Sequence, residues 1–224
     1  MGAFDEKGDG MSQIQPGRLN KPAETRPESP PIKPLTEYSV RDFVESLAAK
    51  TPAPGGGSVA ALTGALAAAQ ACMTIAYTLG KPRFQAVESR LHEQIERLHQ
   101  AAAQLQSLME EDRAAYVALN NILKIPAASR PMDQFAALVV AAIQAPQTVA
   151  TVALQVLESC RVLQDKINPL LASDLRIAAI LARAAVAASE QNMLVNVPLL
   201  PDPEQARHFT QRACELRRQA EALS

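Results

Sequence analysis

The chain has 224 residues, of which 48% are hydrophobic, and its formal net charge is -1 at pH 7. This length suits one sizeable globular domain. Lysine and arginine are scattered along the chain and form no basic cluster, which argues against nucleic acid as the main partner. Aromatic residues make up only 4% and alanine is frequent. We therefore expect a core of small side chains in closely packed helices.

The cysteines and the apolar stretches place the chain among cytoplasmic proteins. Cys72, Cys160 and Cys214 are odd in number and far apart, which argues against a disulfide framework, and we expect them to fill the core. The N-terminus lacks the apolar region of a secretory signal. The longest mostly apolar stretch, 59–77, is interrupted by glycine and polar residues. It predicts a buried helix and no membrane span.

Residues 1–36 are rich in proline mixed with glycine and charged residues. Such a segment buries too little apolar surface to order itself, so we expect a disordered tail followed by one helical domain over 37–224. The domain opens with a short helix that extends to Lys50. Ser39 and Asp42 have the spacing of a capping box at the start of this helix.

The rest of the chain is predicted to be helical from its apolar periodicity and its helix-terminating residues. The expected helices span about 55–79, 82–123, 131–163, 173–191 and 203–222. Gly80, with Pro82 beyond it, ends the first of these, and Pro146 should kink or divide the third. Asp202 and Pro203 have the N-cap and first-turn positions of the last. The expected fold class is an all-α, elongated bundle of about six helices.

The helix over 82–123 carries an apolar seam at alternating spacings of four and three. Its members are Phe84, Leu91, Leu98, Leu105, Asp112 and Leu119, with the companions Glu88, Ile95, Ala102, Met109 and Tyr116. A helix of about 40 residues spans about 60 Å, which exceeds the diameter of a small domain. We therefore expect part of the seam to pack on a second subunit of a homodimer.

Asp112 interrupts a series whose other members are leucine or phenylalanine. Two interpretations are open. A slight rotation of the helix leaves Asp112 solvated at the edge of the seam, beside Glu110 and Glu111. Alternatively, Asp112 is a site carboxylate in a cleft lined by Met109 and Tyr116, where burial would raise its pKa.

The stretch TPAPGGGSVAAL, residues 51–62, places Gly55, Gly56, Gly57 and Ser58 at the start of a helix. Backbone N–H groups at a helix N-terminus attract anions, and glycines allow a ligand or another backbone to approach closely. The stretch is not a P-loop, because no Gly-Lys-Ser/Thr follows. The alternative is a turn that serves only tight helix packing.

Further polar candidates lie towards the C-terminus. Ser173 and Asp174 stand at the start of the fifth helix, either as ordinary capping residues or as site residues. Asn168, Asn192 and Asn196 are placed in or near the flanking loops, where asparagine forms turns or could hydrogen-bond a heterocycle. The three histidines show no metal-site spacing, so no metal is predicted.

The opening run VRDFVESLAAKTPAPGGGSVAALTGALAAAQACM, residues 40–73, resembles the cyclodeaminase/cyclohydrolase family. This is the folate domain of formiminotransferase-cyclodeaminase and of stand-alone methenyltetrahydrofolate cyclohydrolases. The resemblance covers about 38–222. It continues through GKPRF at 80–84, EEDRAAY at 110–116, SDLRIAAIL at 173–181 and NMLVNVPLLPD at 192–202.

The resemblance implies a dimeric all-helical enzyme that acts on one-carbon units of tetrahydrofolate, with no cofactor besides this substrate. Members either deaminate 5-formimino-tetrahydrofolate or hydrolyse 5,10-methenyl-tetrahydrofolate to 10-formyl-tetrahydrofolate. Asp112 would then be the main carboxylate, as general base or electrostatic stabiliser, and Ser173 and Asp174 would orient the substrate. The implied substrate-binding residues are Gly55, Gly56, Gly57, Ser58, Tyr116, Asn168 and Asn196.

Four positions depart from the family pattern: Leu194, Ile167, Leu170 and Ala76. Leu194 stands where a basic residue is usual, which weakens the case for binding the folate glutamate tail. The leading hypothesis is a folate enzyme, with the cyclohydrolase reaction favoured for a stand-alone chain. The alternative is a catalytically silent helical dimer of the same family that binds a small molecule or a protein partner. A structural protein whose tail recruits a partner is a third option.

Overall fold

The computed structural model describes residues 33–223, and the secondary structure of that part is helical. Its longer elements are α1 (Val40–Ala48), α2 (Gly56–Ala76), α3 (Glu88–Leu123), α4 (Met132–Leu163), α5 (Ala172–Asn196) and α6 (Pro203–Ala222). The predicted all-α bundle with one long helix is confirmed. The predicted disorder of residues 1–32 lies outside the described part of the chain.

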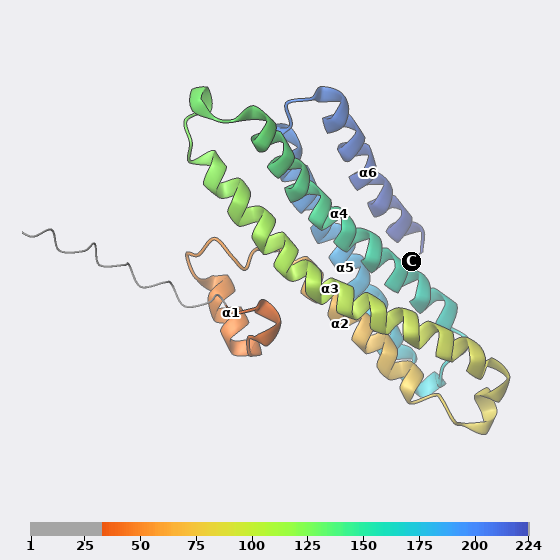
Figure 1. Cartoon of the computed structure of the whole chain (residues 1–224). Coiled ribbons are helices and arrows are strands. Elements are labelled where there is room, and N and C mark those ends of the chain that lie inside the picture. The colour runs from red at the N-terminus through yellow and green to blue at the C-terminus, as the bar shows by residue number, and fades with distance from the viewer. Residues whose placement is uncertain (1–32, 224) are drawn as a thin grey trace, which may run out of the picture. The chain divides into compact units, whose positions relative to one another are not determined.

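Helices α2 to α5 lie side by side and form the bundle, and α6 packs along α5 and α4 towards one end (Figure 1). The α2 helix packs between α3 and α5 through small residues. Gly64 is one point of close approach, since a β-carbon there would lie 3.1 Å from the Leu105 methyl groups. Alanines fully buried around it are Ala60, Ala61, Ala67, Ala68 and Ala71. Small side chains therefore let these helices approach closely.

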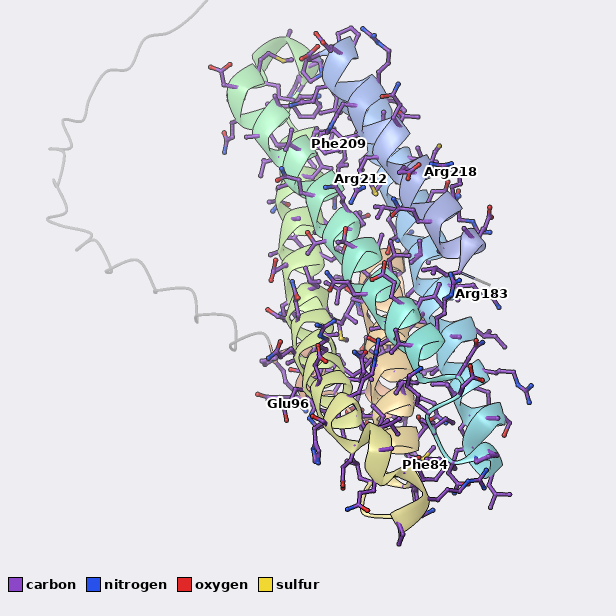
Figure 2. The ribbon with its side chains drawn as sticks, turned by 90° about the vertical axis from the view of Figure 1, so that its right-hand side faces the viewer. Phe84, Glu96, Arg183, Phe209, Arg212 and Arg218 are labelled. Carbon is purple, nitrogen blue, oxygen red and sulfur yellow. The ribbon has the colours of Figure 1, made fainter. Side chains whose placement is uncertain are left out.

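A second apolar cluster fills the end of the bundle where α6 packs. Phe209 of α6 is buried there against Phe135 and Val139 of α4. Glu96 and Arg218 point away from the bundle on its outer surface (Figure 2). Helix α6 thus buries its apolar stripe against α4 and solvates its charged face, as an amphipathic helix in a bundle does.

Most predicted helix ends agree with the structure. The capping box is confirmed: the Asp42 N–H donates to Ser39 Oγ, and the Ser39 N–H donates to Asp42 Oδ2, both at 3.1 Å. The long helix begins at Glu88, after a 3-10 segment over Pro82–Val87. Pro146 lies inside α4 without dividing it.

Two sequence-based placements were wrong. The α5 helix continues to Asn196, so Asn192 and Asn196 lie in its last turns and not in a loop. The apolar periodicity of α5 weakens after Gln191, which concealed this extension. Cys214 is exposed, whereas Cys72 and Cys160 are buried as expected.

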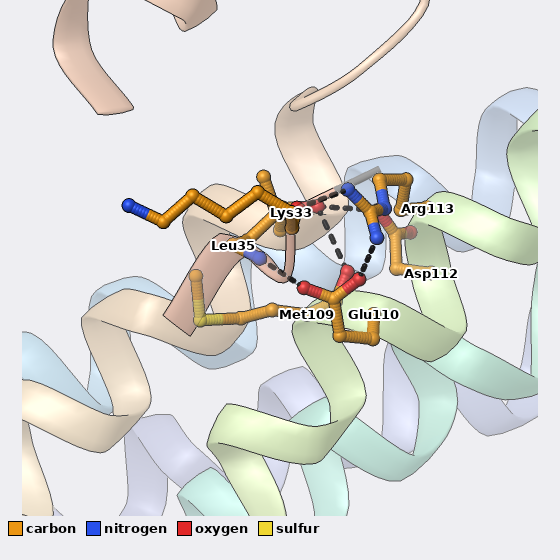
Figure 3. Close-up of polar contacts among 7 residues, drawn as sticks. Lys33, Leu35, Met109, Glu110, Asp112 and Arg113 are labelled. Carbon is orange, nitrogen blue, oxygen red and sulfur yellow. Dashed lines mark hydrogen bonds and ion pairs between the residues drawn. The ribbon is translucent and has the colours of Figure 1, made fainter. Parts of the chain in front are cut away.

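Residues 33–36, which the sequence placed in the tail, belong to the helical unit. Leu35 is buried in the core, and its N–H donates to the Glu110 carboxylate. Arg113 pairs with the same carboxylate and donates to the Lys33 carbonyl at 3.2 Å (Figure 3). Glu110 and Arg113 together therefore hold the segment before α1 on α3.

The α2 and α4 helices are long and apolar enough to cross a membrane by length and composition. In the most apolar 18-residue stretch of each helix, 56% of the α2 residues and 50% of the α4 residues are buried inside the bundle. Core helices of a helical bundle have these same properties, and the core clusters include both helices.

Candidate functional site

Asp112 on α3 lies against the first turn of α2. The Ser58 hydroxyl is 3.2 Å from Asp112 Oδ2 and also 3.2 Å from the Met109 carbonyl oxygen. Ser58 is fully buried. The carboxylate is thus held at a helix N-terminus, where the free N–H groups and the helix dipole favour negative charge.

The glycines at the start of α2 make room for these side chains. A β-carbon on Gly57 would lie 1.8 Å from Asp112 Oδ1, and one on Gly56 would lie 2.8 Å from Asn192 Oδ1. A β-carbon on Gly55, in contrast, would meet open space. Two of the three glycines are therefore required by neighbouring polar side chains, which explains why the chain places them at a helix start.

Two opposing effects act on the pKa of Asp112. Burial raises the pKa of this carboxyl above its ordinary value and is the larger effect, whereas hydrogen bonds from the Ser58 side chain and backbone lower it. A carboxylate with a raised pKa is a better proton acceptor near neutral pH than a solvated one. Asp112 is half-buried, is held by the Ser58 hydroxyl and faces a cavity, so the interpretation of it as a solvated edge residue is wrong.

Asp112 opens into a cavity of about 280 Å³ between the 51–57 turn and the helices α3, α4 and α5. Its polar walls include Thr51, Arg113, Tyr116, Asn192 and Asn196. Met109, expected in this cleft, is buried and contributes only its carbonyl oxygen behind Ser58. The cavity thus joins a carboxylate, a phenol, an arginine and two amides in one place.

Pro146 determines how one of these amides is held. Because proline has no N–H, the carbonyl of Ala142, one turn earlier in α4, lacks its usual helical donor. The Asn196 amide donates to this carbonyl at 3.3 Å and to the Asn192 carbonyl at 3.1 Å. Asn192 in turn donates to the Ala188 carbonyl at 3.0 Å. Both amide nitrogens are therefore fixed.

The other predicted site residues lie towards the opposite end of α2. Gln70 donates to the Asp174 carboxylate at 3.0 Å, and Ser173 precedes Asp174 on the exposed side of α5. The Asn168 N–H donates to the Thr78 hydroxyl at 3.0 Å. Gln70 follows Gly57 by thirteen residues, or about 20 Å along the helix. One chain therefore does not bring these residues to Asp112.

Arg113 and Asn192 are two polar residues of the cavity that were not predicted as site residues. Arg113 follows Asp112 and is a single arginine in a charged stretch, which gives no signal by itself. Asn192 was considered only as a loop residue. Asn192 and Asn196 are four residues apart, so a predicted helix that continued to Asn196 would have placed both on one face.

The fold and this site define a helical protein with a half-buried acid at a glycine-rich helix start. The family model described as formiminotransferase-cyclodeaminase matches residues 39–215. The chain belongs to this family. The match covers every element described above except the segment that precedes α1 and the end of α6.

Three relatives show the range of the similarity. The chain is 32% identical to pig (Sus scrofa) formimidoyltransferase-cyclodeaminase over 87% of its own length and 37% of that protein. It is 28% identical to methenyltetrahydrofolate cyclohydrolase of Methylorubrum extorquens, over 73% of this chain and 81% of the relative. The crystal structure of formiminotetrahydrofolate cyclodeaminase from Thermotoga maritima superposes with a TM-score of 0.77 at 26% identity, covering 84% and 92% of the two chains.

The chain spans less than half of the animal proteins that it matches. A more local match to the mouse (Mus musculus) formimidoyltransferase-cyclodeaminase is 41% identical but covers 45% of this chain and 18% of that protein. By contrast, the bacterial cyclohydrolase and the Thermotoga structure are matched over most of their length.

Proposed function

We propose that this protein is a tetrahydrofolate one-carbon enzyme and that its reaction is hydrolysis of 5,10-methenyl-tetrahydrofolate to the 10-formyl compound. The observation that carries the proposal is the Asp112 carboxylate, held by Ser58 and facing the cavity at the start of α2. The family supports a folate substrate, and the match to 81% of the length of a methenyltetrahydrofolate cyclohydrolase supports hydrolysis.

The chemistry requires an acceptor for a proton and a counterion for a cation. The methenyl bridge is a cationic amidinium, which the Asp112 carboxylate can stabilise. Water adds to the bridge carbon, and Asp112 accepts the water proton as the carbon–oxygen bond forms. Cleavage of the bond to the N5 nitrogen, which takes up a proton, leaves the formyl group on N10. Tyr116 and the amides of Asn192 and Asn196 supply hydrogen bonds to the ligand.

The alternative reaction uses the same residues. In 5-formimino-tetrahydrofolate, attack by N10 on the imino carbon expels ammonia and closes the methenyl bridge. Asp112 would then accept the N10 proton and deliver a proton to the departing nitrogen. The similarity to the Thermotoga cyclodeaminase structure favours this second candidate.

We further propose that the protein is a homodimer. Large apolar side chains are exposed on α1, α2 and α5, at Val40, Val44, Leu66, Tyr77, Ile177, Ile180 and Val195. Helix α2 is apolar on its outward face as well as its inward face, which is typical of a helix buried on both sides. Exposed apolar side chains on these neighbouring helices suit a self-complementary interface.

A dimer of this kind would also complete the site. The cavity at Asp112, about 280 Å³, is smaller than the roughly 300–1,000 Å³ of common ligand pockets, and a folate needs more room. If the α2–α5 faces of two subunits pack antiparallel, the Asp174 end of one face lies near the Asp112 end of the other. The partner subunit's Ser173 and Asp174 would then lie close to Asp112.

A spectroscopic assay tests the reaction. Purified protein is mixed with 5,10-methenyl-tetrahydrofolate near neutral pH, and the loss of the methenyl absorbance is followed after subtraction of the spontaneous rate. Asp112→Asn should lose at least ~100-fold in rate, the contribution of a general base. Asp133→Asn, an exposed carboxylate at the start of α4, is the matched control and should keep the full rate.

The outcomes separate the alternatives. Ammonia release from 5-formimino-tetrahydrofolate, with no enhanced loss of methenyl absorbance, assigns the cyclodeaminase reaction. Absence of both activities, together with absence of folate binding, assigns the silent member of the family and overturns the proposal.

Subunit complementation tests the composite site. Asp112→Asn and Asp174→Asn should each be inactive alone. If each site takes one residue from each subunit, mixed dimers keep one intact site, and random mixing restores about one quarter of the activity. No recovery in verified mixed dimers would show that both residues act within one chain or that Asp174 is not needed.

A further inference from the structure

Another cavity in the described part of the chain lies away from Asp112, between the middle of α3 and the second half of α4. Its volume is about 490 Å³, within the range of about 300–1,000 Å³ that is typical of small-molecule sites. The helices are held apart here by their facing residues, and Leu98, Ala101 and Val156 line the cavity as buried apolar contacts.

Two buried polar side chains line this cavity without a partner. Gln94 of α3 is 4% exposed and Ser159 of α4 is 8% exposed. Neither side chain has a hydrogen bond to another described residue, and their polar atoms are not among the fully buried unpartnered atoms, so these atoms face solvent in the cavity. Buried amides and hydroxyls are almost always hydrogen-bonded to protein or water, because leaving the bond unmade is costly. Water or a ligand in the cavity therefore supplies their hydrogen-bond partner.

The charges around the cavity favour a neutral partner. Arg97 lies at the rim and is already paired with Glu93 at 2.6 Å, and Glu158 is exposed on the other wall. No charged side chain is buried beside Gln94 and Ser159 in the described residues. An ion at this depth would lose its hydration without a countercharge, which is costly.

The polar groups favour an amide. A glutamine side chain offers two donors and an acceptor, and a serine hydroxyl offers one donor and two acceptor positions. Three further glutamines, Gln100, Gln104 and Gln155, stand at the rim. A side-chain amide forms paired hydrogen bonds with an adjacent N–H and C=O of a ring, as glutamine does with a nucleobase edge. The apolar floor suits the face of such a ring.

We infer that this cavity, the α3–α4 cavity, is a second binding site that takes a neutral cyclic amide or ureide. The ring lies on Leu98, Ala101 and Val156, and its N–H and C=O groups pair with Gln94 and Ser159. This site is separate from the Asp112 site and does not depend on the reaction proposed there.

A pair of probes tests the hydrogen-bond chemistry. Uracil carries adjacent N–H and C=O groups, whereas 1,3-dimethyluracil has the same ring without N–H donors. Each is titrated into the full-length, isotope-labelled protein while the side-chain amide signals of glutamine are followed by NMR. Uracil should shift the Gln94 signal with saturation at millimolar concentration, as expected for a ligand of this size. Dimethyluracil should bind at least ~10-fold more weakly.

Matched variants locate the site. Gln94→Leu should weaken uracil binding by at least ~10-fold, and Ser159→Ala should weaken it by roughly 3- to 10-fold. Gln85→Leu, an exposed glutamine outside the cavity, should leave binding unchanged. If Gln94→Leu fails to fold, Ser159→Ala and the two probes still decide the result.

Three results would overturn the inference. They are saturation by neither probe, equal binding of both probes, and uracil binding that is not weakened by Gln94→Leu or Ser159→Ala in a folded protein. In each case the cavity would hold solvent only, since water can satisfy Gln94 and Ser159 in a polar cavity of this size.

Discussion

The Asp112 carboxylate lies directly on the backbone of Gly57, so closely that a β-carbon at residue 57 would come within 1.8 Å of Asp112 Oδ1. Gly57→Ala should therefore displace the carboxylate, reduce activity by at least ~10-fold and destabilise the protein by roughly 1–3 kcal/mol. Steady-state kinetics and urea unfolding measure the two effects.

Gly55→Ala is the matched control for this prediction. Gly55 has an extended backbone that any residue adopts, and open space at its β-carbon position. The change should alter stability by less than about 0.5 kcal/mol. Equal effects of the two substitutions would show that the glycines serve the turn and not the placement of Asp112.

The raised pKa of Asp112 predicts a pH dependence of stability. Because the folded state binds this proton more tightly than the unfolded chain, the contribution of Asp112 to stability is largest below its ordinary pKa of 3.8. It decreases as pH rises from 3.8 through the raised pKa of the folded state. Asp112→Asn cannot ionise, so at neutral pH it should be more stable than the wild type although it is inactive.

Urea unfolding between pH 3 and pH 7 checks this sign. The stability difference between Asp112→Asn and the wild type should shrink as pH falls and vanish near the lower limit. A variant that is less stable than the wild type at pH 7 would show that hydrogen bonds from Ser58 outweigh burial. Asp133→Asn, which is exposed, should show no such trend.

Pro146 should influence substrate binding through Asn196. With Pro146→Ala, the new N–H can donate to the Ala142 carbonyl and compete with the Asn196 amide, which now donates there at 3.3 Å. We expect a KM several-fold higher for Pro146→Ala and for Asn196→Ala. The double variant should be no worse than Asn196→Ala alone, because both changes remove the same interaction.

A double-mutant cycle on KM measures this coupling. Additive effects would mean that Pro146 acts on the site by a route other than Asn196, or only on the stability of α4.

The Glu110–Arg113 pair should control how firmly α1 is held. Arg113 donates to the Lys33 carbonyl and pairs with Glu110, which accepts from the Leu35 N–H (Figure 3). Loss of these charge-assisted bonds in Arg113→Ala should favour local opening of residues 33–48 by roughly 1–2 kcal/mol. Hydrogen exchange in this segment should accelerate, while the core of α4 keeps its protection.

Arg97→Ala is the control for this prediction. Arg97 also forms an ion pair on α3, with Glu93, but both side chains are more than half exposed. Such exposed pairs contribute little to stability. Exchange in residues 33–48 should not change. If Arg113→Ala leaves the exchange of this segment unaltered as well, burial of Leu35 alone holds it.

Local chemistry made much of this protein predictable. The caps at Ser39 and Asp202, the stop at Gly80 and the apolar seam of α3 depend on neighbours a few residues away, so pattern alone located them. The interruption of that seam by Asp112, together with the glycines at 55–57, indicated the candidate site from the sequence alone. The resemblance of several blocks in order indicated the family.

Tertiary packing decided what those patterns left open. Whether Asp112 was solvated or buried depended on the rotation of α3 against α2, and which glycines were needed depended on Asp112 and Asn192 lying against them. Likewise, the Ala142 carbonyl freed by Pro146 meets Asn196 only because α4 and α5 run side by side. These contacts join residues more than 50 positions apart, and their energies arise from close packing, which a local pattern does not encode.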